Sequence, residues 1–490
     1  MQLRLGTFRH LVTASAFLFP ACAAVQPDFL LPSIEADRKL GQEVSKKVEE
    51  EMGILEEVGL SSYVASLGQR LAAQIPNRQF PFTFQIVDQA EPNAFAVPGG
   101  YVYVSRGLLA LVSSEEELAG VLGHEIVHVE RRHTARQLQK ARLPSLLTLP
   151  GRAAGWVIGG ELGEIVSSPF EAVGAAYLSA HSRQDELEAD EVGQAIAARA
   201  GYDPRALAGM LDRLERFERL LTGSERGFSF FATHPMTPQR VAEITDHAKG
   251  IAWTPRPGIA ASRADLLRRL DGLQLGQNPA AGIFRGRQFL HPDLDFSIEF
   301  PRNWKTMNTR RLVGAVAPDE EALAYLGVRG KGTDPSRTAE AFVQAVQREF
   351  GIKPSRSERV QIGQWPGHVV TLTDTSGGKP VHMHFLWVAA RGIIYQMVGL
   401  APDQHREVLR QAALSFRPLT PAERTSITET RLRVVAAREG ETLAQLSRRT
   451  QDQWKPETTA VVNGIQPGAP LKQGQLVKVA VRQPFTAAGK

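Results

Sequence analysis

The chain has 490 residues and a net charge of +5, with 43% hydrophobic and 22% charged residues. This balance is typical of folded proteins and excludes a disordered chain, while the length favours two or three domains over one core. The basic residues form no concentrated stripe in the sequence, so we expect no nucleic acid partner.

The N-terminus has the pattern of an export signal. Arg4 and Arg9 precede the short apolar run LVTASAFLF, and the small residues PACAA follow it. Because this run is shorter than the about 20 residues that span a bilayer, we predict a signal peptide over residues 1–24. The only cysteine, Cys22, leaves two alternatives open: cleavage just after it, or its lipidation. Either way we expect an exported protein of the periplasm or the outer-membrane periphery, touching the membrane only through a lipid anchor.

Several elements follow in chain order. Periodic apolar residues predict two helices within residues 35–75, and alternation predicts a strand at 82–87. A Pro-Gly-Gly turn favours a hairpin over residues 93–104. Ser114 and Glu117 have the spacing of a capping box, which predicts a helix of about 25 residues starting at Ser114. Together these elements predict a mostly helical region with a small sheet over residues 25–270.

The helix predicted from Ser114 carries His124-Glu125-Ile126-Val127-His128. Four residues rotate a helix by about 400°, so the two histidines share a face and can bind one metal ion. Glu125 lies about 60° around the axis from His128, where a general base for a metal-activated water would stand. Two histidines on a polar helix face are the competing interpretation.

A third metal ligand has to come from elsewhere, because catalytic zinc has three protein ligands and an open position. The stretch HSRQDELEAD places Glu186 and Asp190 four residues apart, on one face of a further helix that should end at Gly201. Glu186 is the candidate ligand, and Asp190 could fix the tautomer of a ligand histidine. The alternative is a solvated acidic face. His133 lacks the glycine spacing of a metzincin ligand, so we expect a surface or supporting residue there.

Four sequence blocks occur in order along residues 35–250: NAFAVPGGYVYVSRGLL, GHEIVHVERRH, SRQDELEADEVG and THPMTPQRV. Together they resemble metallopeptidase family forty-eight, the group that holds the CAAX prenyl proteases, HtpX and BepA-like proteins. The resemblance implies a zincin fold of the gluzincin type. It also implies that Zn²⁺ is bound by His124, His128 and Glu186, with Glu125 as the base.

The same resemblance assigns supporting residues. It implies Asp190 beside a ligand, and His234 and Arg240 as further catalytic residues, with His234 either a removable fourth ligand or a group that stabilises the transition state. The segment NAFAVPGG, at the start of the first block, resembles the family's substrate-binding edge strand. An extended peptide would pair there with the following residues: Asn93, Ala94, Phe95 and Ala96.

Two further units are expected after the peptidase region. Alternating strands and one helix near 338–350 predict an α+β domain over residues 285–418, and its opening, HPDLDFSIEFPRNWK, resembles a PsbP-like domain. Residues 430–483 have the order strand, helix, helix, strand and resemble a LysM module, a class that binds glycans such as peptidoglycan. A plain βααβ adaptor is the alternative for this last unit.

The sequence therefore predicts an α+β protein that works as a zinc-dependent endopeptidase of the bacterial cell envelope. It would hydrolyse misfolded or unassembled envelope proteins with a metal-activated water and Glu125 as general base. Two other functions stay open. One is a chaperone-like binder of unfolded envelope proteins with gated proteolysis, and the other is a zinc amidase acting on peptidoglycan peptides.

Overall fold

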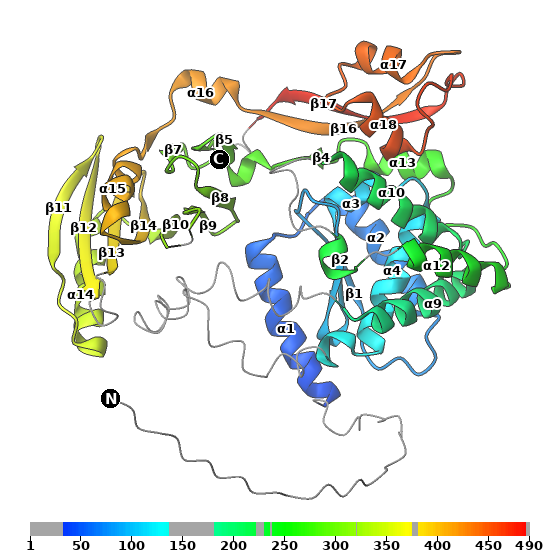
Figure 1. Cartoon of the computed structure of the whole chain (residues 1–490), viewed down its shortest axis with the longest axis horizontal. Helices are drawn as coiled ribbons and strands as arrows, with labels where there is room; N and C mark the ends of the chain where they lie inside the picture. Colours follow the sequence, from blue (N-terminus) through cyan, green and yellow to red (C-terminus); the bar gives the residue numbers. More distant parts are fainter. Residues whose placement is uncertain are drawn as a thin grey trace, which may run out of the picture.

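The arrangement of these elements is given by a computed structural model (Figure 1), which describes residues 33–136, 181–221, 230–235, 238–319, 321–374 and 381–486. The predicted signal peptide and Cys22 lie outside the described residues. Within the described ranges, no helix is both long enough and apolar enough to cross a membrane.

The peptidase region is mostly helical, as predicted. Its helices are α1 (Ile34–Glu51), α2 (Val58–Ala72), α3 (Arg106–Leu111), α4 (Glu115–Glu130), α9 (Arg183–Ala200), α10 (Ala206–Leu220), α11 (Phe230–Thr233), α12 (Pro238–Gly250) and α13 (Arg263–Leu270). A continuous apolar core joins α2, α4, α9 and α10. This core fixes how α4 and α9, the two helices with candidate metal ligands, lie against each other.

A small sheet packs beside these helices. Its strands are β1 (Thr83–Val87), β2 (Ala94–Val97) and β3 (Tyr101–Ser105), in the order β1-β3-β2. The predicted hairpin is confirmed, because β2 and β3 pair antiparallel across the short turn η2 (Pro98–Gly100). Gly99 has φ 84 in this turn, a conformation that favours glycine. In the order β1-β3-β2, strand β2 lies at one edge of the sheet.

Helix α4 is shorter than the predicted length, since it ends at Glu130 after 16 residues. Arg132 adopts a left-handed backbone with φ 55, which cannot continue a right-handed helix, and residues 133–136 are helical again. Only half of the predicted capping box forms. Ser114 accepts a hydrogen bond from the Glu117 backbone, whereas the Glu117 carboxylate accepts from the backbone of Ser113 instead. The break at Arg132 turns His133 back toward α4.

The second region contains more strands than the sequence predicts. Its main sheet has the order β11-β12-β13-β14-β10-β9-β8. Its elements are η5 (Pro279–Ala281), β5 (Ile283–Arg285), β6 (Gln288–His291), β7 (Phe296–Glu299), β8 (Lys305–Asn308), β9 (Leu312–Val316), β10 (Leu323–Lys331), α14 (Pro335–Phe350), β11 (Arg356–Ile362), β12 (Trp365–Asp374), β13 (Val381–Ala390), β14 (Ile393–Pro402), η6 (Asp403–His405), α15 (Arg406–Leu414) and β15 (Arg417–Pro418). Separate apolar clusters on the two faces of the sheet pack against α14 and α15. The α+β class is therefore as predicted.

The C-terminal unit follows α16 (Pro421–Ser426) and has the predicted order of elements. These are β16 (Thr428–Ala436), α17 (Leu443–Thr450), α18 (Pro456–Asn463) and β17 (Leu476–Pro484). It lies against the peptidase region in Figure 1, where β16 pairs with β4 (Gln274–Leu275) and Val462 joins the core of that region. The two parts thus share one folded body, while the LysM-like resemblance stays a prediction.

A buried lysine fixes this contact. Lys478 is 0% exposed, and its Nζ donates to the backbone carbonyls of Ala110, at 2.8 Å, and Val112, at 2.7 Å. These carbonyls lie at the end of α3, so the side chain satisfies acceptors that the helix leaves unpaired.

Replacing this lysine should loosen the contact between the C-terminal unit and the peptidase region. We expect Lys478→Met to destabilise the protein by about 2–4 kcal/mol, because two buried carbonyls lose their donor. The urea midpoint of unfolding measures the effect, and Lys472→Met, at an exposed site of the same unit, is the matched control. Equal midpoints for both variants would contradict the role given to Lys478.

Candidate metal centre

Two helices cross closely enough to bring the candidate ligands together. A Cβ added to Gly123 on α4 would meet the carbonyl oxygen of Gly193 on α9 at 2.9 Å, and one added to Gly193 would meet the backbone nitrogen of His124 at 2.8 Å. Glycine is therefore needed on both sides of the crossing. This close approach lets a side chain from α9 reach the histidine face of α4.

The predicted ligands meet at one buried point. His124 Nε2 lies 2.9 Å from His128 Nε2. Glu186 reaches the same place, with Oε2 3.6 Å from His124 Nε2 and Oε1 3.5 Å from His128 Nε2. His234 completes the group, and one donor atom from each of the four residues lies within 4.8 Å of the others. All four side chains are about 1% exposed.

These distances fit a tetrahedral metal ion. With metal–ligand bonds of about 2.0–2.1 Å, neighbouring donors in such a site lie about 3.3 Å apart. The observed separations of 2.9 Å between the two α4 histidines and 3.5 Å between His128 and Glu186 bracket that value. Two imidazole nitrogens and a carboxylate are also ligands that zinc prefers. The residues present therefore suit a divalent ion of this kind.

Each ligand histidine is held by a second group. His124 Nδ1 lies 2.9 Å from Asp190 Oδ1, and Arg240 binds both oxygens of Asp190 at 2.6 and 2.9 Å. Arg240 also contacts Glu186 at 2.7 Å. Such partners fix the tautomer and orientation of a metal ligand. In this arrangement Asp190 contacts His124, and Arg240 contacts both Asp190 and Glu186.

His133 supports the other ligand histidine. Its Nδ1 lies 3.0 Å from Nδ1 of His128, and its Nε2 lies 3.2 Å from Glu188 Oε2. His133 is fully buried but does not belong to the four-residue donor group. The backbone break at Arg132 precedes His133. The His133 ring contacts His128 and not the donor atoms themselves.

Removing His133 should weaken metal binding without removing a ligand. We expect His133→Ala to lower the affinity for zinc by about 10–100-fold, as is usual when the partner of a ligand histidine is lost. Competition with a chromophoric chelator measures the affinity. His368→Ala, in the second region, should bind zinc like the unchanged protein, and an equal affinity for His133→Ala would exclude the supporting role.

Glu125 lies beside the donor group and is 1% exposed. Its Oε1 atom makes no hydrogen bond to any described residue, although His234 Nε2 lies 3.4 Å away. An unpaired buried carboxylate oxygen is costly unless something else binds it. Glu125 Oε1 can therefore accept a hydrogen bond from a group bound beside the four donors.

The protonation states of these groups suit metal binding. Burial lowers the pKa of His128 well below its usual value, which keeps the ring neutral. Burial alone would raise the pKa of Glu186, but His234, His124 and Arg240 outweigh it, so the pKa is lowered and the carboxylate stays ionised. Burial raises the pKa of Glu125, a shift that a general base would need. These shifts favour the deprotonated forms of His128 and Glu186, which metal binding requires.

Another histidine at the site was not predicted. The His181 ring stacks on His128, with centroids 4.0 Å apart, and burial lowers the pKa of His181 to about 3. Its backbone N–H donates to the carbonyl of Thr233, next to His234. In the sequence, His181 directly precedes the SRQDELEAD block, and this position was the only available signal.

The predicted peptide-binding residues lie on and next to strand β2. β2 is an edge strand that packs against α4, and the backbone N–H of Phe230 donates to Pro92 just before it. Asn93 is 0% exposed, and neither its Oδ1 nor its Nδ2 bonds to any described residue. The strand thus runs beside the helix that carries the metal donors.

Comparisons with known proteins agree with this geometry. Residues 60–248 match the sequence profile of Peptidase family M48. The chain is 29% identical over 245 residues to the Beta-barrel assembly-enhancing protease of Escherichia coli, covering 48% of this chain and 47% of that protein. It is 26% identical over 236 residues to the Mitochondrial metalloendopeptidase OMA1 of Schizosaccharomyces pombe, covering 48% of this chain and 65% of that protein. The chain thus spans about half the length of the first relative.

A solved structure resembles part of the chain. The solution structure of cyanobacterial PsbP from Synechocystis overlaps 30% of this chain and 99% of that one, with 10% sequence identity and a TM-score of 0.22. A likeness of this size supports no conclusion, so the PsbP-like assignment of the second region stays a prediction. For the first region, the sequence match and the converging donors agree, and residues 60–248 form a metallopeptidase domain of family M48.

Proposed function

We propose that this protein is an exported zinc-dependent endopeptidase of the cell envelope that cuts misfolded or unassembled proteins. The observation that carries the proposal is the convergence of His124, His128 and Glu186 next to Glu125, whose buried Oε1 has no hydrogen-bond partner among the described residues. The name of the Escherichia coli relative, an assembly-enhancing protease, supports the assignment to the envelope.

The residues would divide the chemistry as follows. A zinc ion held by the three donors would lower the pKa of a bound water and polarise the peptide carbonyl. Glu125 would take the proton of the attacking water and pass it to the leaving amine. Asp190 and Arg240 would keep His124 and Glu186 in place throughout the reaction.

The substrate would bind as an added strand. Among the described residues, the backbone of β2 makes hydrogen bonds only to β3, and its outer edge makes none. An extended segment could therefore pair its backbone with residues 93–96, as in other peptide-binding proteins that use a sheet edge. Backbone pairing gives little side-chain selectivity, which suits unfolded substrates of varied sequence.

We further propose that His234 holds the site closed at rest. Its Nδ1 lies 3.2 Å from His124 Nε2 and 3.0 Å from Glu186 Oε1, within the donor group itself. With four protein donors, a tetrahedral site has no open position for water or substrate. The peptidase would then work slowly until His234 moves away, which combines the endopeptidase with the gated behaviour of the chaperone-like alternative.

Metal removal tests the proposed activity directly. We expect the mature protein to cleave casein slowly, to stop when treated with 1,10-phenanthroline, and to recover when zinc is added back. The isomer 1,7-phenanthroline, whose two nitrogens cannot bind the same ion, is the control and should have no effect. Cleavage that persists after zinc has been removed, as confirmed by elemental analysis, would exclude a metallopeptidase.

A further inference from the structure

The main sheet of the second region presents a polar row next to apolar rows on one face. Strand pairing places Arg356, Thr371 and His384 side by side across β11, β12 and β13. The neighbouring row on the same face is apolar over three strands and consists of Val369, Leu386 and Met397. A molecule lying along this face would therefore meet charge at one end and apolar surface at the other.

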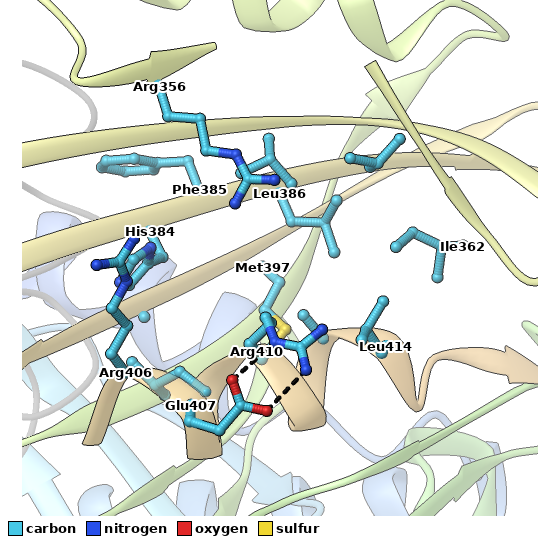
Figure 2. A pocket seen from close by; sticks show the side chains of 15 residues that line it. Arg356, Ile362, His384, Phe385, Leu386, Met397, Arg406, Glu407, Arg410 and Leu414 are labelled. Atoms are coloured by element: carbon cyan, nitrogen blue, oxygen red, sulfur yellow. Dashed lines mark hydrogen bonds and ion pairs between the residues drawn. The ribbon is translucent and has the colours of Figure 1, made fainter. Parts of the chain in front are cut away.

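Helix α15 lies over this face and encloses a cavity of about 490 Å³ (Figure 2). Ile362, Leu386 and Met397 line it from the sheet, and Leu409 and Leu414 line it from the helix. Leu414 is 46% exposed, so the cavity is open to solvent at this part of its wall. Cavities of about 300–1,000 Å³ with apolar walls and a few polar groups are typical ligand sites.

The charged groups of the cavity are not equivalent. Arg410 is neutralised by Glu407, which accepts two hydrogen bonds from it at 2.7 and 2.8 Å, and Arg356 pairs with Glu358. Arg406, in contrast, has no acidic partner within the part of the chain that the structure describes. Figure 2 shows its guanidinium beside the ring of His384. Among the described residues, the charge of Arg406 at this end of the cavity is therefore not compensated by an acid.

The ring of His384 also has a free position. Its Nδ1 bonds to the Thr371 hydroxyl at 3.2 Å, while its Nε2 is buried and bonds to no described residue. Burial and the nearby Arg406 lower the pKa of His384 to about 4, so the ring is neutral at pH 7. A ligand oxygen next to Arg406 could accept a hydrogen bond from this nitrogen.

We propose that this cavity binds a single-chain amphiphile with an anionic head group. The acyl chain would lie against Ile362, Leu386 and Met397, and the head group would contact Arg406 and His384, with Arg356 close by. A peptide suits the cavity less well. The backbones of β12, β13 and β14, which form most of the wall, are paired with strands on both sides. Buried peptide groups of a ligand lying over them would stay unpaired, whereas an acyl chain has none.

Fluorescence binding to the full mature chain tests this proposal. The probe is a dansyl-labelled undecanoic acid, and the competitors are palmitate, lysophosphatidylglycerol and methyl palmitate. We expect saturable binding that both anionic competitors displace and that the neutral ester displaces at least about tenfold less well. The relative affinities of palmitate and the lysolipid then assign the head group as carboxylate or phosphate.

Two matched variants separate the cavity from general charge effects. Arg406→Gln should weaken probe binding about five- to tenfold, because it removes the cavity charge that has no acidic partner among the described residues. Arg337→Gln removes the same charge from α14, which covers the opposite face of the sheet, and should leave binding unchanged. Both sites are exposed, so both variants should fold.

Three outcomes would overturn the proposal. They are no saturable binding of the probe, displacement by methyl palmitate as strong as by palmitate, and equal affinities for Arg406→Gln and Arg337→Gln. Displacement by a peptide with a free C-terminus but not by its amide, without displacement by palmitate, would assign the cavity to a peptide chain end instead.

Discussion

Changing Glu125 to glutamine should reduce casein cleavage by about 10²–10⁴-fold, the usual contribution of a general base. Glutamine has nearly the same size as glutamate but cannot take up the proton of an attacking water. Glu125 is also not one of the four grouped donors, so the variant should keep its zinc. Initial rates of peptide release, together with the zinc content by mass spectrometry, measure both effects.

The matched control for this change lies on the same helix. Glu116→Gln alters the first turn of α4 without touching the donor group and should cleave casein at the rate of the unchanged protein. If Glu125→Gln retains that rate while binding zinc, another group must act as the base. If it loses zinc, the structural role of Glu125 is larger than the geometry indicates.

Changing His234 to alanine should have the opposite effect and raise casein cleavage about tenfold or more. A preference for the closed state of about 1.4 kcal/mol already keeps roughly nine tenths of the molecules closed, and alanine cannot close the site. The His234 ring lies 3.0 Å from Glu186 Oε1 and 3.4 Å from Glu125 Oε1, so contacts to both acids hold it in place. Removing the ring takes away the contact to Glu125 and leaves three protein donors in place of four.

This second prediction separates the two roles that the sequence leaves open for His234. A rise in rate identifies it as a removable fourth donor. A fall in rate of about 10²–10³-fold would instead identify a group that stabilises the transition state, and would contradict the gate. His247→Ala changes a histidine of the neighbouring helix α12 that bonds to Gln194, and serves as the control.

Much of the centre could be predicted because it depends on local spacing. His124 and His128 share a face of α4, and Glu186 and Asp190 share a face of α9, simply because residues four apart on a helix do. The crossing of the two helices depends on contacts distant in the sequence. The pair Gly123 and Gly193 makes that crossing, and neither glycine stands out among the many in the chain.

Other features were missed for similar reasons. The helix from Ser114 was predicted too long because arginine rarely adopts the left-handed backbone that ends it at Arg132. A lysine within an alternating strand indicates an exposed side chain, so the burial of Lys478 against α3 could not be foreseen. Short strands such as β8 and β9 were overlooked because few residues carry their pattern.

The central claim is that the donor group on α4 and α9 cuts peptides with Glu125 as its base. The most direct measurement compares casein cleavage by His234→Ala with cleavage by the double variant Glu125→Gln/His234→Ala, both loaded with zinc. We predict that the single variant cuts and that the double variant, with equal zinc content, does not. Equal cleavage by both would contradict the claim, because the activity would then not depend on Glu125.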